Sequence, residues 1–114
     1  MSDVICIGHC AYDIIFGLES FPLENNKVQI EQSSESGGGP SANAAYLLAF
    51  WGVSSAFAGL LGEDVYGRLA IEEFKQVGVD LSLMEVRRGF ATPLSVILVN
   101  EKNASRTIIN RTRP

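Results

Sequence analysis

The sequence predicts an α/β fold in which a few parallel core strands pack against two helices and carry a small antiparallel β appendage. Two observations support this prediction. Short apolar runs alternate with two helical segments along most of the chain, and only strand-like segments follow. With 114 residues, 46% of them hydrophobic and 19% charged, the chain can form one folded domain with a hydrophobic core.

The first half of the chain contains two predicted strands and one predicted helix. Residues 3–8, DVICIG, form an apolar run that ends in glycine, which predicts a strand buried on both faces. Residues 27–36 begin with alternating apolar and polar side chains and predict a half-buried strand. Residues 41–51 predict a helix with Gly52 as its C-terminal cap. Because this helix is apolar nearly all round, we expect it to be buried on most sides.

The second half adds a core strand at residues 53–62 and an amphipathic helix at residues 63–79, which Gly78 ends. Apolar side chains are expected on the inner side of this helix: Leu69, Ile71, Phe74 and Val77. Charged side chains are expected largely outside: Arg68, Glu72, Glu73 and Lys75. Further strands are predicted at residues 82–88, 93–100 and 105–110, the last two forming a hairpin around the polar turn EKNA.

The end of the chain follows directly after a predicted strand. A sheet of so few core strands, covered by two helices, would keep an unpaired edge and an uncovered face. We therefore expect residues 1–114 to be the front part of a longer protein.

Composition argues against several classes of partner. The net charge of −4 and the small number of basic residues argue against nucleic acid, which needs clustered Lys and Arg. No apolar run is long enough to span a membrane, and the N-terminus lacks the pattern of a signal peptide. A single histidine, His9, and two cysteines make a zinc site improbable. We expect a reduced, cytoplasmic protein with Cys6 in a core strand.

The least ordinary stretch is residues 34–52, SESGGGPSANAAYLLAFWG, in which three glycines and a proline run into a helix. Ordering glycine is costly unless the backbone needs positive φ or a group must approach it closely. A structural turn before the helix and a ligand site both remain open on this ground. The spacing differs from the Walker loop, and residues 7–13 lack the later glycines of the dinucleotide fingerprint, which disfavours a dinucleotide-binding or flavodoxin-like domain.

Two polar residues accompany the glycine run. Asn43 lies in the first turn of an otherwise apolar helix, and Asp13 lies just beyond the end of the first predicted strand. A carboxylate, an amide and the bare backbone of Gly38 and Gly39 would suit the hydroxyl groups of a small polyol. Taken alone, Asn43 also fits a helix cap and Asp13 also fits a turn.

Four segments in order resemble one known family: ICIGHCAYDII, SGGGPSANAAYLLAFWG, GLLGEDVYGRLAIEEFKQVGVD and ATPLSVILVNEKNASRTII. From Val4 to about Ile109, the chain resembles the N-terminal portion of the ribokinase-like (PfkB) carbohydrate kinases. The GGGP opening and the RTIIN ending look most like members that act on keto-sugars or their acidic derivatives.

The resemblance implies that residues 1–114 are the N-terminal part of a single kinase domain, cut before its nucleotide-binding half. It implies that Asp13, Gly38, Gly39 and Asn43 bind the sugar. Strands at about 14–35 and 92–109 would form an antiparallel lid that closes over the sugar and excludes water. In several members such a lid also forms a homodimer contact.

Two positions bear on which sugar is bound. Ribose-phosphorylating members have an asparagine two places before the lid aspartate, where this chain has Ala11, which puts ribose in doubt. Arg106 would lie on a lid strand and reach an anionic substituent of the sugar, or else be solvated. Arg111 and Arg113 are expected to be solvated.

The catalytic base and the phosphate cradle of the family lie in a Gly-Ala-Gly-Asp segment that this chain lacks. Glu63 and Asp64 in LLGEDVYG are better interpreted as acids at a helix start. The resemblance therefore implies ATP and Mg²⁺ as cofactors of the full-length enzyme, with no catalytic, cofactor or metal ligand in this chain, which alone should be inactive. The alternative is a non-catalytic sugar-binding or dimerisation module.

Overall fold

The computed structural model describes residues 2–111. Eight strands and two helices follow one another along this part of the chain: β1 (Val4–Ile7), β2 (Ala11–Leu18), β3 (Ser33–Gly38), α1 (Pro40–Phe50), β4 (Ser55–Ala58), β5 (Leu60–Gly62), α2 (Val65–Val77), β6 (Glu85–Arg87), β7 (Leu94–Asn100) and β8 (Arg106–Arg111). Their order confirms the predicted α/β class, with helices between the early strands and strands alone after α2.

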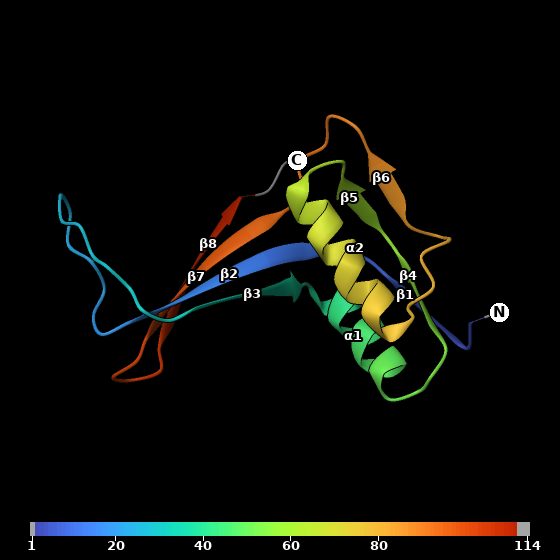
Figure 1. Cartoon of the computed structure of the whole chain (residues 1–114), viewed down its shortest axis with the longest axis horizontal. Coiled ribbons are helices and arrows are strands. Elements are labelled where there is room, and N and C mark those ends of the chain that lie inside the picture. The colour runs from blue at the N-terminus through green and yellow to red at the C-terminus, as the bar shows by residue number, and fades with distance from the viewer. Residues whose placement is uncertain (1, 112–114) are drawn as a thin grey trace.

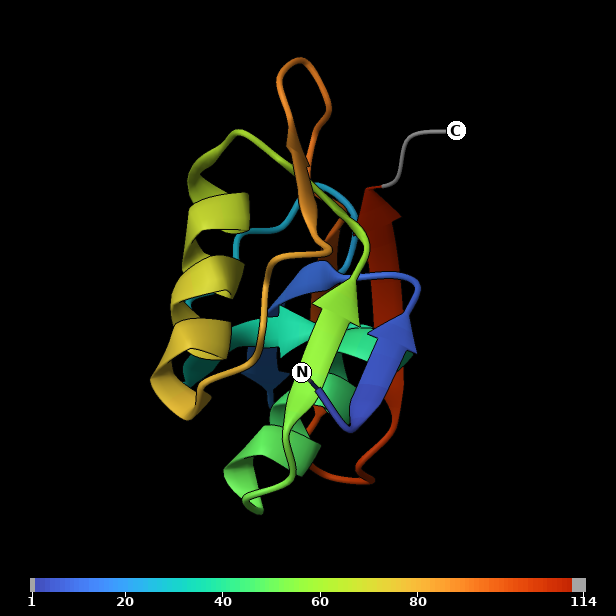
Figure 2. The ribbon, with the colours of Figure 1, turned by 90° about the vertical axis from the view of Figure 1, so that its right-hand side faces the viewer.

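The molecule has two parts, as Figure 1 shows. At one end, α1 and α2 pack beside short parallel strand pairs, β1 with β4 and β5 with β6. At the other end, β2, β3, β7 and β8 extend away from the helices as one sheet. Figure 2, turned by a right angle, shows β1 and β4 side by side in front. In the part of the chain that is described, no helix is long and apolar enough to cross a membrane.

The four-stranded sheet has the order β3-β2-β7-β8. Its outer pairs, β2 with β3 and β7 with β8, are antiparallel, whereas the central pair β2 and β7 is parallel. The predicted antiparallel lid is therefore a mixed sheet, because β2 and β7 both leave the helical part in the same direction. The strand expected at residues 27–36 is also shifted to β3, and residues 19–32 connect the strands without forming one.

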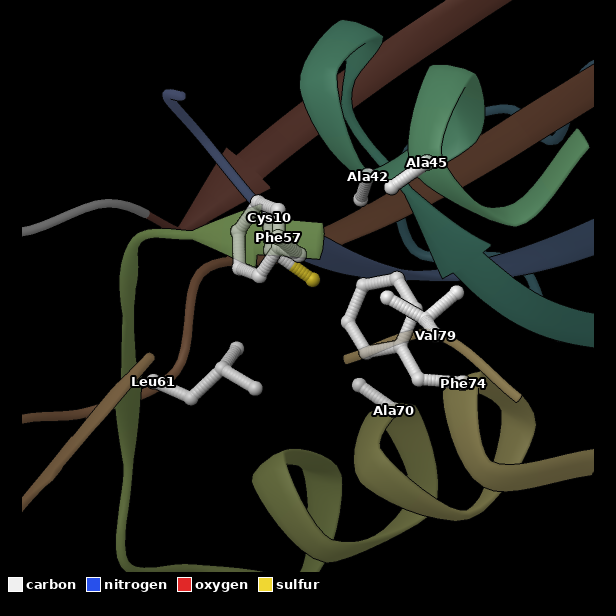
Figure 3. Packing of buried hydrophobic residues seen from close by; sticks show 8 residues of the cluster. All are labelled: Cys10, Ala42, Ala45, Phe57, Leu61, Ala70, Phe74 and Val79. Carbon is white, nitrogen blue, oxygen red and sulfur yellow. The ribbon is translucent and has the colours of Figure 1, made fainter. Parts of the chain in front are cut away.

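The core lies between the helices and the parallel strands (Figure 3). Its buried members are Cys10, Ala42, Ala45, Phe57, Leu61, Ala70, Phe74 and Val79. The rings of Phe57 on β4 and Phe74 on α2 stack with their centroids 5.1 Å apart and join the two layers. Small side chains on the inner faces of α1 and α2 let both helices approach the strands closely.

Three burial predictions are wrong. β1 was expected to be buried on both faces, but Ile7 is 77% exposed, because within residues 2–111 β1 has a strand neighbour, β4, on one edge only. Helix α1 buries only its alanine side and leaves Trp51 67% exposed. In α2, Ala70 rather than Leu69 faces the core, because the buried positions follow Gly67 and Phe74 at helical spacing.

A carboxylate at the start of α2 joins the two parts of the molecule. Asp64 caps the helix by accepting the Gly67 N–H at 2.8 Å, as the prediction of a helix-start acid requires. It also accepts the Thr92 N–H at 2.8 Å and the Thr92 hydroxyl at 2.7 Å. Thr92 is fully buried just before β7. Asp64 therefore fixes the point at which β7 leaves the helical part.

Burial alone would raise the pKa of Asp64, but the hydrogen bonds from Thr92 and Gly67 and the charge of Arg111 outweigh it and lower the pKa. The lowered pKa means that ionised Asp64 stabilises the folded state fully at pH values above the ordinary pKa of an aspartate. That stabilisation is lost as pH falls through the lowered value.

We expect Asp64→Ala to lower the free energy of unfolding by about 1–2 kcal/mol at neutral pH, the cost of losing a helix cap. The deficit should shrink in acid, where the wild-type carboxylate is protonated. Urea unfolding monitored by circular dichroism at several pH values measures both effects. Glu63→Ala is the matched control, since Glu63 pairs only with the exposed Arg88 and should change stability by less than about 0.5 kcal/mol. Equal effects of the two substitutions would contradict the assignment.

Candidate functional site

Pairing of β2 with β3 brings the predicted carboxylate to the glycine run. Asp13 is the third residue of β2 rather than a residue beyond a strand end, and it lies opposite Ser36. Its side chain lies on the same face of the sheet as Gly38, so close that a Cβ atom at Gly38 would lie 2.2 Å from Asp13 Oδ2. Glycine at this position is therefore what lets the carboxylate lie flat against the backbone of β3.

Gly39 makes the corner between β3 and α1. Its φ of 99° lies in a region that other residues rarely adopt, and a Cβ atom there would meet the backbone oxygen of His9 at 2.5 Å. Gly39 offers no side-chain cap to α1. Ser41 ties the start of the helix to the end of β1 by donating its hydroxyl to the Ile7 oxygen at 2.9 Å. The start of α1 is thus held beside the loop that precedes Asp13.

Asn43 lies one helical turn beyond this corner. Its N–H makes the first helical hydrogen bond, to the Gly39 oxygen at 2.9 Å, and its side chain is exposed. Asn43 therefore does not cap the helix, which removes the structural alternative considered for it. Its side chain lines a cavity of about 340 Å³ that is also bordered by Gly37 of β3 and Glu73 of α2.

The sequence reasoning missed the role of Glu73, which was expected on the outer side of α2. Glu73 is half-buried and accepts the N–H of Gly37. Spacing in the helix could not reveal this contact, because the partner is a backbone group from another element. Asp13 does not border the cavity. The structure thus brings Asp13 together with Gly38, and Asn43 together with Gly37, on the two sides of the glycine corner, residues 37–39.

The electrostatics of the corner favour binding of neutral donors. Burial raises the pKa of Asp13, and the charge of His9 lowers it in part. From the sequence, His9 was considered only as a zinc ligand. Its position four residues before Asp13 in the sequence could have indicated that the two side chains lie near each other. Burial, with Glu73 and Asp13 nearby, raises the pKa of Cys10 to about 12, so its thiol stays protonated.

Arg106 lies on a lid strand, as expected, but away from Asp13. It pairs with Val99, whereas the row of residues level with Asp13 reaches β8 at Asn110. Four residues of strand, roughly 13 Å, separate Arg106 from that row. We therefore leave Arg106 out of the candidate site.

Arg111 is exposed, as expected, and it also helps to fix the start of β7. It donates to the Thr92 oxygen at 3.1 Å and lies 5.8 Å from the centre of the Tyr66 ring. Arg113, also expected to be solvated, lies outside the described residues.

Among residues 2–111, no three His, Cys, Asp or Glu side chains are grouped to hold a metal ion. No glycine-rich phosphate loop precedes a lysine in the sequence either.

Comparison with known proteins matches residues 1–113 to the pfkB family of carbohydrate kinases. The chain is 31% identical to mouse ketohexokinase over 106 residues, which are 93% of this chain and 36% of that protein. It is 30% identical to an ATP-dependent ribose-1-phosphate kinase of Halopiger xanaduensis, over 89% of this chain and 34% of that protein. The structure of Arabidopsis thaliana ribokinase complexed with ribose and ATP matches with a TM-score of 0.85 and 25% identity, over 97% of this chain and 36% of that one.

The chain spans about a third of the length of the curated relatives that it matches.

The glycine corner predicts different costs for two glycines that both have positive φ. Gly39→Ala should lower stability by more than Gly52→Ala, because only at Gly39 does the new Cβ also meet a backbone atom. We expect about 1 kcal/mol for Gly52→Ala, from φ alone, and clearly more for Gly39→Ala. Urea midpoints of the two variants measure the difference, and equal midpoints would show that His9 moves aside freely.

The raised pKa of Asp13 predicts that its ionised form destabilises the unliganded protein. When the pKa of a carboxyl is raised in the folded state, the protein loses stability as the pH rises from the ordinary pKa of the group through the raised pKa. Asp13→Asn should therefore be more stable than wild type at pH 7, with the difference closing as pH falls toward 4. Thermal unfolding across this range tests the sign. A variant less stable than wild type at pH 7 would show that Asp13 is stabilised by contacts instead.

Proposed function

Because the chain belongs to the pfkB family of carbohydrate kinases, we propose that it supplies the sugar-binding and lid part of an enzyme that uses ATP to phosphorylate a sugar hydroxyl. The single observation that supports this role best is the Asp13 carboxylate held against the bare backbone of Gly38. Relatives named for ketohexose, ribose-1-phosphate and nucleoside substrates share the same segment.

In the proposed site, Asp13 accepts hydrogen bonds from sugar hydroxyl groups. Burial has removed part of the water around the Asp13 carboxylate. Hydrogen bonds from the sugar hydroxyls would replace those lost with this water, which makes them favourable. Gly38 and Gly39 let the sugar approach the backbone, and the first free N–H groups of α1 lie beside it. Asn43 lies on the other side of the glycine corner from Asp13 and lines a cavity that Asp13 does not border, so its amide would reach the sugar only from that side.

The four-stranded sheet is proposed to be the lid. Its strands extend away from the helices (Figure 1), and Asp13 lies near the start of β2, at the end of the sheet beside the helices. Closure over the sugar would exclude water, so that phosphate is transferred to the sugar hydroxyl and not to water. A homodimer contact through these strands and a cytoplasmic location stay predictions.

ATP and Mg²⁺ are the proposed cofactors of the complete enzyme, and they supply the phosphoryl group and its charge stabilisation when bound. No residue of this chain is assigned to hold them. The contribution of this chain is to bind and orient the sugar hydroxyl and to keep water away from it.

The test uses the natural polypeptide that carries this sequence, at its full length, with Mg-ATP and four acceptors: D-fructose, adenosine, ribose 1-phosphate and a 2-keto-sugar acid. We expect sugar-dependent ADP release with at least one acceptor. Asp13→Asn should lower kcat/KM about 10- to 100-fold, since hydrogen bonds to a charged group are worth about 1.5–3 kcal/mol. The matched control is Asp3→Asn, which makes the same change at an exposed position before β1 and should leave kcat/KM unchanged.

Residues 1–114 alone should release no ADP above background with any acceptor. Release of ADP by this segment would overturn the proposed division of labour. Sugar binding by the full polypeptide without any phosphorylation would instead favour a non-catalytic sugar-binding module.

A further inference from the structure

Four polar or charged side chains form one row across the four-stranded sheet. Asp13 on β2 lies opposite Ser36 on β3 and opposite Ser95 on β7, and Ser95 lies opposite Asn110 on β8. Paired residues of neighbouring strands point to the same face of a sheet. The row therefore extends the surface around Asp13 across all four strands, at the end of the sheet nearest the helices.

The two members of the row on β7 and β8 are joined by a hydrogen bond. Ser95 donates its hydroxyl to Asn110 Oδ1 at 2.7 Å, which fixes the orientation of the amide. With its oxygen occupied, Asn110 keeps the two N–H bonds of Nδ2 as donors. Asn110 is exposed and Ser95 is half-buried, so these donors are accessible to a ligand on this face.

The Ser95–Asn110 pair has the opposite hydrogen-bonding character to Asp13. The Asp13 carboxylate accepts hydrogen bonds, whereas the Asn110 amide donates them. Two strand spacings, roughly 10 Å, separate the backbones of Asp13 and Asn110. A single ligand that reaches both must therefore carry hydroxyl donors at one end and an acceptor at the other.

Cationic side chains are missing from this part of the face. Along the described strands, the residues on the face of Asp13 include one cation, Arg106, which lies roughly 13 Å along β8 from Asn110. Arg111, next to Asn110, points to the opposite face, where it contacts Tyr66. The row thus offers hydrogen bonds to a neutral group and no countercharge for a phosphate or carboxylate.

We propose that Ser95 and Asn110 form a specificity-determining pair that binds a neutral hydrogen-bond acceptor on the part of the sugar substrate remote from Asp13. This inference rests on the proposed function and narrows its substrate class. The substrate is a sugar with a neutral, acceptor-bearing substituent, such as a ketohexose with its terminal hydroxymethyl group or a nucleoside with its base. A sugar phosphate or sugar acid is disfavoured. This differs from the expectation that Arg106 reaches an anionic substituent of the sugar.

The experiment compares four variants of the full-length natural polypeptide on its best acceptor among D-fructose, adenosine, ribose 1-phosphate and a 2-keto-sugar acid. Asn110→Ala and Ser95→Ala should raise KM about 3- to 10-fold, the value of one neutral hydrogen bond, with kcat changed less than twofold. Arg106→Ala is the matched control on the same strand and face and should leave KM unchanged. Asp13→Asn reports on the proposed function itself.

A shortened acceptor separates substrate contact from a structural role. With a sugar that lacks the remote substituent, D-ribose for adenosine or D-xylulose for D-fructose, wild type and Asn110→Ala should have equal KM values. A general distortion of the sheet would raise KM for both acceptors alike and would overturn the proposal. Because Asn110 is exposed and Ser95 is only half-buried, the two alanine variants test the pair independently if one of them folds poorly.

The outcomes separate the two claims. If Asp13→Asn lowers kcat/KM about 10- to 100-fold while Asn110→Ala and Ser95→Ala behave as wild type, the pair is not a specificity determinant and the proposed function stands. A wild-type preference of tenfold or more for ribose 1-phosphate or the sugar acid would also overturn the neutral subsite. If the polypeptide phosphorylates none of the four acceptors, the proposed function fails and this inference fails with it.

Discussion

The glycine corner depends on a backbone that carries no side chains where β3 meets α1. Any Cβ atom at Gly38 would collide with the Asp13 carboxylate, and one at Gly39 would collide with the His9 backbone. The carboxylate, the β1–β2 loop and the start of α1 therefore lie closer together than ordinary residues allow. This constraint explains why the chain accepts the entropic cost of glycine at positions 38 and 39, and at Gly37 a Cβ atom would crowd the Glu73 carboxylate that accepts its N–H. A tight turn alone would require fewer.

The second constraint sets where the extended sheet leaves the helical part. Asp64 binds both the backbone and the hydroxyl of Thr92, and Arg111, at the end of β8 that pairs with the start of β7, donates to the Thr92 oxygen. Thr92 directly precedes the segment that pairs with β2, so its position fixes the register of β7 against Asp13. A slip of one residue would turn Ser95 to the opposite face. The composition of the polar row is thus a consequence of a helix cap some distance away in the sequence.

Local signals in the sequence predicted the elements well, and contacts between elements account for most of the errors. Both helices begin and end close to their expected bounds, because Asp64 and Gly78 cap α2, and Gly52, expected as the cap of α1, directly follows the observed C-cap residue Trp51 with a positive φ of 87°. Exposure of β1 and the Gly37–Glu73 contact depend on which elements become neighbours, which periodicity cannot give. Of the predicted site, Asp13 and Gly38 meet, and Asn43 lies one turn beyond Gly39.

The pairing register explains why the sequence indicates Arg106 as a ligand-binding residue and gives no sign of Ser95 and Asn110. In a linear sequence an arginine suggests a partner by its charge, whereas a serine and an asparagine are unremarkable on strands. Only the order β3-β2-β7-β8 makes them neighbours of Asp13 and places the arginine four residues away. Desolvation already opposes the ionised form of Asp13, and the charge of His9 offsets this only in part. A phosphate or carboxylate beside Asp13 would add repulsion, and the row itself holds no cation. Neutral hydrogen bonds add no such repulsion, so the electrostatics and the geometry of this face favour the same class of ligand.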